Sequence, residues 1–176
     1  MNVPGKARIA VAALTLSAAG FVGIMSREDI KLEAYADPVH GWAVPTIGAG
    51  STEGVKRGDT ITPLGAVQRS LREVGVYEGA IRGCVKAPLH QHEFDAYTQL
   101  AHNIGARAFC VNPKTGGPAV IPRHLNANPP DYEGACNAIL EYRRAGDVDC
   151  STPGNKVCAG LWKDRLRVHA LCKGGA

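Results

Sequence analysis

Residues 26–51 constrain the chain most, because this short stretch combines two acidic residues with a run rich in glycine, proline and threonine. Its sequence is SREDIKLEAYADPVHGWAVPTIGAGS. Ser26 has an acid three residues later, which is typical of a helix N-terminus and predicts a helix over residues 27–35 with Glu28 in its first turn. Asp37 then falls in a turn. The two acids are therefore expected on different elements.

Two acids on separate elements can face each other across a gap, whereas two on one helical face leave no room for a sugar ring. Glycoside hydrolysis needs such a pair, with one carboxyl protonated and the other ionised. Glu28 suits the general acid, and Asp37 suits the carboxylate that polarises a water. Thr46, which opens the glycine-rich segment, would help to hold that water. The plain structural alternatives are a helix-dipole acid, a turn residue and a β-branched strand residue, respectively.

This stretch resembles the catalytic region of the T4-type phage lysozymes, the phage muramidase family. The family pattern is a Glu, eight residues, an Asp or Cys, five residues, a Thr, and an Ile-Gly-x-Gly run. Glu28, Asp37 and Thr46 fill the three places, although eight residues rather than five separate Asp37 from Thr46. The similarity extends nearly to the C-terminus through Ala34–Val39, Glu93–Ala96, Asn103–Gly105, Gly134–Cys136 and Leu171–Cys172.

The resemblance implies an α+β, lysozyme-like fold. It consists of a small β lobe at about residues 36–60, a long joining helix and a mainly helical C-terminal lobe, with a cleft between the lobes. It also implies a phage endolysin, a monomer without a cofactor, that hydrolyses the β-1,4 bond between N-acetylmuramic acid and N-acetylglucosamine in peptidoglycan and lyses the host. With a water positioned by Asp37 the reaction would invert, and the two carboxyl groups would lie about 6.5–9.5 Å apart.

Three further residues are assigned to the substrate by the resemblance alone. Gln99 and Asn103 lie on a predicted helix that lines the cleft in this family. Arg165 lies where the family's last helix carries an Arg near the catalytic Glu, but the usual neighbouring Arg is here Asp164.

Two other functions compete with this interpretation. A lytic transglycosylase would use one acid and no water, and the presence of both Asp37 and Thr46 argues against it. The second competing function is that of a secreted, disulfide-bonded protein that binds the cell wall and has no enzymatic activity. The formal charge of +4 suits an anionic partner such as cell wall. The chain has no run of basic residues, so nucleic acid is not indicated as a partner. His90 and His92 could suggest a metal, but no ligand set completes a site, so no metal is expected.

The chain has six cysteines, an even number without a CxxC motif. This favours a disulfide framework formed in an oxidising compartment. Cys150 and Cys158 bracket a short loop and are the expected local pair. The sequence gives no basis for pairing the other four, which are Cys84, Cys110, Cys136 and Cys172.

Residues 9–25 form a run without a charge. It is short for a membrane span, and its five Ala and two Gly make it weakly apolar. One interpretation is a cleaved signal peptide, ending at about residue 19. The other is a signal-anchor-release segment over residues 1–25. It would export the protein, tether it to the host inner membrane and later release it to the periplasm, with residues 26–176 as the catalytic domain.

The remaining helices follow from apolar periodicity and from start and stop residues. The sequence predicts helices over residues 62–83, 91–104, 119–126, 131–144 and 161–172. Residues 106–118 and 147–157 are expected as loops, and turns are expected at Pro38–Gly41 and Glu53–Gly54.

Overall fold

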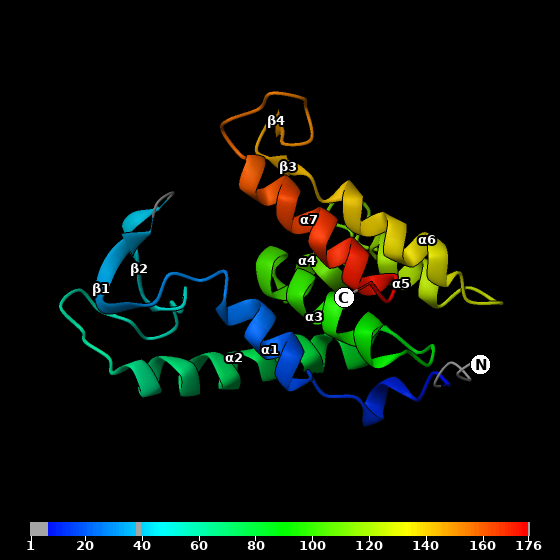
Figure 1. Cartoon of the computed structure of the whole chain (residues 1–176), viewed down its shortest axis with the longest axis horizontal. Helices are drawn as coiled ribbons and strands as arrows, with labels where there is room; N and C mark the ends of the chain where they lie inside the picture. Colours follow the sequence, from blue (N-terminus) through cyan, green and yellow to red (C-terminus); the bar gives the residue numbers. More distant parts are fainter. Residues whose placement is uncertain (1–6, 38–39, 176) are drawn as a thin grey trace. The chain divides into compact units, whose positions relative to one another are not determined.

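The computed structural model describes residues 7–37 and 40–175 (Figure 1). The chain divides into two units. Residues 18–76 form the smaller one, called here the sheet unit, and residues 1–17 with 77–176 form the helical unit. The long helix α2 (Pro63–Cys84) begins in the first and ends in the second.

The sheet unit contains helix α1 (Ala18–Met25) and the antiparallel strands β1 (Lys31–Asp37) and β2 (Gly41–Gly48). The other edge of β1 is also paired. The Ala34 N–H donates to the Asp59 carbonyl at 2.9 Å, and the Ile61 N–H donates to the Leu32 carbonyl at 2.9 Å. β1 is thus hydrogen-bonded on both edges, to β2 in a two-stranded sheet (Figure 1) and to residues 59–61 through an isolated bridge.

The predicted helix over residues 27–35 is wrong. Ser26 follows a helix instead of starting one, because its N–H donates to the Val22 carbonyl at 2.9 Å as the last turn of α1 closes. Residues 31–37 form β1, so the β lobe begins earlier than the predicted residue 36. The sequence KLEAYA has no strong barrier to a helix, but hydrogen bonds on both edges of β1 outweigh weak local propensity.

Helix α2 confirms the prediction for residues 62–83. The Thr62 hydroxyl oxygen accepts the Gly65 N–H at 3.0 Å, as expected of a helix N-cap. Pro63 occupies the first helical position, where the absence of an N–H costs nothing. The predicted turn at Glu53–Gly54 is present, with Gly54 at φ +67°. Pro38 and Val39 of the other predicted turn lie outside the described residues.

Helix α3 (Gln91–Ile104) is the centre of the helical unit, and its bounds are those predicted. All residues from Glu93 to Ala101 are buried, so the helix is enclosed on every side. Helix α7 (Ala159–Cys172) packs against it, and α5 (Val120–Leu125) packs against α6 (Tyr132–Asn137), as Figure 1 shows. The core draws its large buried side chains from these and neighbouring elements: Leu14, Ile81, Leu89, Phe94, Tyr97, Leu100, Phe109, Ile121, Leu125 and Ile139.

Two predictions for this unit need correction. The expected loop over residues 106–118 contains helix α4 (Ala106–Cys110), which forms because Phe109 is fully buried in the core. The helix expected to reach residue 144 ends at Asn137, followed by the 3-10 turn η2 (Ala138–Glu141). The chain then enters a hairpin of β3 (Arg144–Ala145) and β4 (Val148–Asp149).

The early end of α6 has a physical cause in the carbonyl groups that follow it. The Arg143 carbonyl accepts the Cys150 N–H at 2.9 Å, and the Tyr142 carbonyl accepts a hydrogen bond from Arg165 at 2.8 Å. Both carbonyls are thus committed to partners distant in sequence. Gly146, with φ +57°, supplies the hairpin turn that was predicted as a helix stop.

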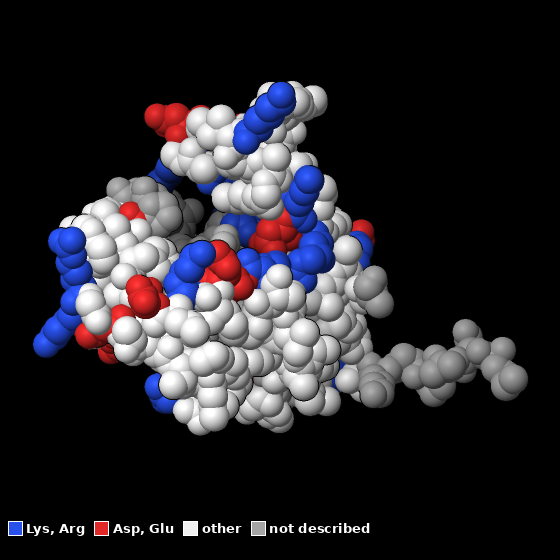
Figure 2. Space-filling view, turned by 60° about the vertical axis from the view of Figure 1, so that its left-hand side comes forward, with Lys and Arg blue, Asp and Glu red and all other residues white. Residues whose placement is uncertain are grey.

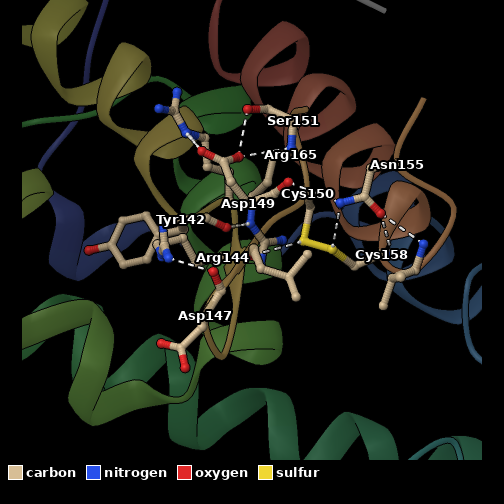
Figure 3. The surroundings of a disulfide bond; sticks show 12 residues. Tyr142, Arg144, Asp147, Asp149, Cys150, Ser151, Asn155, Cys158 and Arg165 are labelled. Carbon is tan, nitrogen blue, oxygen red and sulfur yellow. Dashed lines mark hydrogen bonds and ion pairs between the residues drawn. A yellow bond between two sulfur atoms is a disulfide. The ribbon is translucent and has the colours of Figure 1, made fainter. Parts of the chain in front are cut away.

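Three disulfides are formed: Cys84–Cys110, Cys136–Cys172 and Cys150–Cys158. The last confirms the predicted local pair. It closes the loop after β4, where Asn155 donates hydrogen bonds to the Asp149 carbonyl at 3.0 Å and to the Cys158 sulfur at 3.7 Å (Figure 3).

The uncharged run of residues 9–25 is divided between the two units rather than forming one helix. Ile9 pairs with Leu89, each N–H donating to the other's carbonyl at 2.9 and 2.8 Å. The 3-10 turn η1 (Val11–Ala13) follows, and Val11 and Leu14 are buried in the core of the helical unit. Within residues 7–37 and 40–175, no helix combines the length and apolarity needed to cross a membrane.

Polar contacts also hold this N-terminal segment on the helical unit. Arg8 forms an ion pair with the buried Glu93 at 2.7 Å. The Leu16 N–H donates to Glu78 at 2.6 Å, and the Ser17 N–H and hydroxyl both donate to Asp95, at 2.9 and 2.5 Å. Elsewhere, charges of both signs share the surface drawn in Figure 2, where Lys and Arg lie among Asp and Glu.

Candidate active site

Glu28 lies in the turn between α1 and β1, with its N–H donating to the Met25 carbonyl at 3.3 Å. Glu28 is half-buried. A β-carbon placed on Gly50 would lie 3.8 Å from Oε2 of Glu28, so the carboxylate faces the glycine-rich turn that follows β2. The predicted helix that was to carry Glu28 is wrong, because a turn holds this residue.

Asp37 ends β1, on the strand that directly follows the Glu28 turn. Its Oδ1 accepts the His40 N–H at 2.7 Å and lies 3.1 Å from His40 Nδ1. The Asp37 side chain is 25% exposed. The Asp37 carboxylate is thus oriented by His40 and remains partly open to solvent.

Thr46 lies opposite Tyr35 of β1, although its spacing from Asp37 is three residues longer than in the family pattern. Tyr35 pairs with Thr46, and Ala36 pairs with Pro45, but Asp37 pairs with Gly41. One step along β1 thus corresponds to four steps along β2, and residues 42–44 form a three-residue bulge. The bulge is as long as the excess over the family's five-residue spacing.

The buried Thr46 side chain donates its hydroxyl hydrogen to the Val44 carbonyl at 3.2 Å. Its oxygen lone pairs are left to accept a hydrogen bond. The bulge therefore absorbs the additional residues and leaves Thr46 on the same short sheet as Asp37.

Tyr35 is a site residue that the sequence analysis missed. Burial raises the pKa of its phenol, and the negative charges of Glu28 and Asp37 raise it further. Both carboxyl groups therefore act on the same side chain, which lies on β1 between them in sequence. The signal that could have revealed it is the alternation of Tyr35 and Asp37 on one face of a strand, which the predicted helix obscured.

The glycine-rich turn is held firmly on α2. A β-carbon on Gly48 would lie 3.3 Å from the Ala66 side chain, so the turn approaches the helix closely. Ile47 and Ser51 exchange backbone hydrogen bonds at 2.9 and 3.0 Å, and the Ser51 hydroxyl donates to Glu73 at 2.7 Å. Gly48 and Gly50 both have positive φ, which favours glycine. The surroundings of Glu28 are thus set by a fixed turn.

The three predicted substrate residues meet in the helical unit. Arg165 is 1% exposed, and its guanidinium donates to Asn103 Oδ1, to Asp164 at 2.8 Å and to the Tyr142 carbonyl at 2.8 Å (Figure 3 labels Tyr142 and Arg165). Asp164, which stands where the family usually has an Arg, is thus a hydrogen-bond partner of Arg165.

A second arginine joins this network and was not singled out by the sequence. Arg167 donates to Gln99 Oε1 at 2.7 Å and to Asp164 at 3.2 Å. Gln99 itself is 1% exposed. Gln99, Asn103 and Arg165 therefore belong to one hydrogen-bonded cluster between α3 and α7.

The His90–His92 pair has a structural arrangement. The two rings stack with centroids 5.1 Å apart, and the Glu93 carboxylate accepts the His90 N–H at 2.7 Å, as in a capping box. Across the part of the chain that the structure describes, no three His, Cys, Asp or Glu side chains gather in a way that could hold a metal ion.

The phage lysozyme family model matches residues 25–167, which is most of the chain. The chain belongs to the phage lysozyme family. An endolysin of Salmonella phage P22 is 32% identical over 146 residues, covering 80% of this chain and 92% of that relative. A SAR-endolysin of Pseudomonas phage phiKMV is 34% identical over 88 residues, covering 50% of this chain and 53% of that relative.

Among solved structures, an endolysin from Escherichia coli O157:H7 phage FAHEc1 matches with a TM-score of 0.70 and 28% identity, covering 91% of this chain and 94% of that one. This phage lysozyme thus has the predicted α+β, lysozyme-like fold. Its predicted activity as a peptidoglycan-hydrolysing glycoside hydrolase is likewise confirmed by the family and its endolysin relatives.

Proposed function

We propose that this phage lysozyme is an endolysin that cleaves the β-1,4 bond between N-acetylmuramic acid and N-acetylglucosamine, and that Glu28, Asp37 and Thr46 carry the reaction. The observation that supports this assignment most is the register of the two strands, which puts Thr46 opposite Tyr35 and leaves Asp37 two residues further along β1. Glu28 lies in the turn that leads into this strand, so the two acids come from different elements, as glycoside hydrolysis requires.

In the proposed reaction, Glu28 gives its proton to the glycosidic oxygen as the bond to the sugar's anomeric carbon breaks. Asp37, whose carboxylate accepts the His40 N–H, takes a proton from a water that attacks the opposite face of the sugar. The Thr46 oxygen accepts a hydrogen bond from that water. The product is then the inverted anomer, and no cofactor takes part.

The resemblance assigns Gln99, Asn103 and Arg165 to the sugar chain, and we propose that the exposed Asn103 contacts it, since an amide's donors and acceptors match N-acetyl and hydroxyl groups. Gln99 and Arg165 are both 1% exposed, so their proposed role is to support that surface through their hydrogen bonds. Arg165 fixes Asn103 by hydrogen bonding. Arg167 fixes Gln99 in the same way. Preorganised side chains bind without paying again for their own ordering.

The test is the clearing of outer-membrane-permeabilised Gram-negative cells. Glu28→Gln keeps the side chain's shape but has no proton to give, so we expect activity to fall at least about 100-fold while circular dichroism stays native. Glu33→Gln is the matched control, because Glu33 is an exposed acid on the same strand as Asp37, and it should stay near wild type. Clearing by Glu28→Gln at the wild-type rate would refute the assignment.

The same assay and its products separate the competing functions. A wild-type protein that clears no cells at any concentration would support the non-enzymatic binding protein. An anhydro sugar in the product mass spectrum would identify a lytic transglycosylase. For hydrolysis, proton NMR of the first reducing sugar should show the α-anomer, and initial β-anomer would contradict inversion.

We further propose that residues 1–25 form a signal-anchor-release segment and that residues 26–176 form the catalytic domain. The likeness to a SAR-endolysin supports this. So does the burial of Val11 and Leu14 in the core of the helical unit. Cleavage after residue 19 would remove both side chains, at about 1.5–3 kcal/mol each. The folded protein thus depends on a segment that a signal peptidase would discard.

Before release, the uncharged run would lie in the host inner membrane and Glu28 would be held at its surface, three residues beyond Met25. Replacing both Gly20 and Gly23 by Leu makes the run more apolar, so the protein should stay in the membrane fraction and lysis should be delayed. Replacement of both by Ser is the control. Equal release of the double-Leu variant, or a native N-terminus at Gly20, would refute the proposal.

A further inference from the structure

The three-residue bulge in β2 presents a tryptophan on the surface of the sheet unit. Trp42 is 42% exposed, which is unusual for so large an apolar ring, and exposed apolar area of this kind is unfavourable in water. Ala43 beside it is exposed as well. The spacing between Asp37 and Thr46 is three residues longer here than in the family pattern, and the bulge accounts for this difference. Trp42 lies in the bulge.

An arginine covers one side of this ring. The guanidinium carbon of Arg57 lies 4.7 Å from the centre of the Trp42 ring, a cation–π distance. Arg57 is the first central residue of a tight turn in which the Asp59 N–H donates to the Lys56 carbonyl at 3.1 Å and Asp59 Oδ2 accepts the Lys56 N–H at 2.8 Å. Arg57 is itself exposed, so its donors are available to a ligand.

The sheet fixes this pair close to the proposed base. Asp37 and Gly41 are direct partners in the ladder, and Trp42 follows Gly41. Paired Cα atoms lie about 4.5–5.5 Å apart and consecutive ones 3.8 Å apart, so the Trp42 Cα lies within about 9 Å of the Asp37 Cα. This separation is shorter than a disaccharide. A glycan strand with one sugar at Asp37 therefore reaches Trp42 with a neighbouring sugar.

We propose that Trp42 and Arg57 form an additional binding subsite for the peptidoglycan strand, next to the bond that is cleaved. The inference rests on the proposed function of Asp37. The open side of the indole stacks on the apolar C–H face of a sugar ring, and the guanidinium binds a carboxylate of the attached stem peptide. Arg is suited to this double role because it stacks on aromatic rings and binds carboxylates with two parallel hydrogen bonds.

The chemistry of the surface favours this partner over others. A stem peptide carries carboxylates on an otherwise neutral sugar chain, and Arg57 and Lys56 are adjacent cations on the turn. An exposed aromatic ring with a cation could also lie at a lipid surface, where tryptophan is common. That alternative is an outcome of the experiment below.

The first experiment reads Trp42 directly in the full-length protein. The chain has two tryptophans, so Trp162→Phe leaves Trp42 as the only one, and Glu28→Gln prevents hydrolysis. Soluble, uncrosslinked peptidoglycan strands with stem peptides should shift the Trp42 emission to the blue, with saturation. No change at concentrations that saturate sacculus binding would overturn the proposal. A shift with anionic phospholipid vesicles but not with strands would also overturn it, in favour of a lipid surface.

The second experiment measures binding to purified sacculi, again with Glu28→Gln. Trp42→Ala should weaken binding about tenfold, as expected for a stacked aromatic residue. Leu64→Ala is the control, because Leu64 is a 66% exposed apolar residue on α2 in the same unit, and it should leave binding unchanged. Equal affinity of the Trp42→Ala and Leu64→Ala proteins would refute the subsite.

The role of Arg57 is tested with strands whose stem peptides have been removed by an amidase. Arg57→Ala should weaken binding of intact strands but not of stripped ones, whereas Trp42→Ala should weaken both. Arg72→Ala, an exposed arginine on α2, is the control. An equal effect of Arg57→Ala on both strands would overturn carboxylate recognition. Clearing by the wild-type protein is measured beside these assays, so failure of the subsite and failure of the proposed function remain distinguishable.

Discussion

Gly50→Ala tests whether the glycine-rich turn sets the environment of Glu28, the proposed catalytic acid. Gly50 has φ +88°, a conformation that residues with a β-carbon adopt at a cost of about 1–2 kcal/mol. Alanine also restricts the unfolded chain, which offsets about 0.4–1 kcal/mol of this cost. We therefore expect a net loss of about 1 kcal/mol in the free energy of unfolding. For a chain of this length, that corresponds to a fall in Tm of about 2–4 °C.

The same substitution should change catalysis through Glu28. The new methyl group would lie 3.8 Å from Glu28 Oε2, an ordinary contact without a clash. It excludes water from one side of the carboxylate, and loss of hydration disfavours the charged form. The proposed general acid would then keep its proton to higher pH, and we expect the alkaline limb of the pH–rate profile to move to higher pH.

Gly54→Ala is the matched control for this experiment. Gly54 has φ +67°, but a β-carbon there would meet nothing within 4 Å. Thermal unfolding and the pH dependence of cell clearing are measured for both variants. Both should lose similar stability, and only Gly50→Ala should move the alkaline limb. An unmoved limb in a folded Gly50→Ala protein, or an equal movement in Gly54→Ala, would refute the reasoning.

Two further predictions concern stability. Burial lowers the pKa of His92; the Glu93 carboxylate partly offsets this, and the charges of His90 and Arg8 reinforce it. The unfolded chain therefore binds the proton more readily, and the free energy of unfolding should fall as the pH drops from about 7 to 5. His92→Gln should reduce this pH dependence in urea titrations, and an unchanged slope would contradict it. The chain-entropy model assigns about 3.8 kcal/mol to Cys136–Cys172 and about 2.5 kcal/mol to Cys150–Cys158, from sequence separations of 36 and 8. Replacing the first pair by Ser should therefore destabilise the protein more, and a reversed order in urea unfolding would contradict the model.

The catalytic candidates could be found from the sequence, although one local element was wrong. Glu28, Asp37 and Thr46 were selected through their match to the pattern of the phage lysozyme family, which does not depend on whether a helix or a turn carries them. Tyr35 was missed because its relation to both acids appears only on a strand. Arg167 was missed because its contact with Gln99 joins residues 68 positions apart. Neither contact leaves a pattern in the local sequence.

The sequence by itself determined the elements that local interactions specify. Helix α3 has its predicted bounds because apolar periodicity and a stop at Gly105 act within a few residues of one another. Helix α2 begins where Thr62 and Pro63 predict. The Cys150–Cys158 pair was predictable for the same reason, since the two cysteines are close in sequence and their loop is short.

The tertiary structure decided what depends on distant partners. Residues 31–37 became a strand through hydrogen bonds to β2 and to residues 59–61. The register of that ladder placed the additional residues in a bulge and left Thr46 opposite Tyr35. Leu14 became a core residue because the folded helical unit buries its side chain, and Arg82 of α2 donates a hydrogen bond to its carbonyl at 2.7 Å. In each case weak local preferences were outweighed by burial and backbone hydrogen bonding that exist only after the chain has folded.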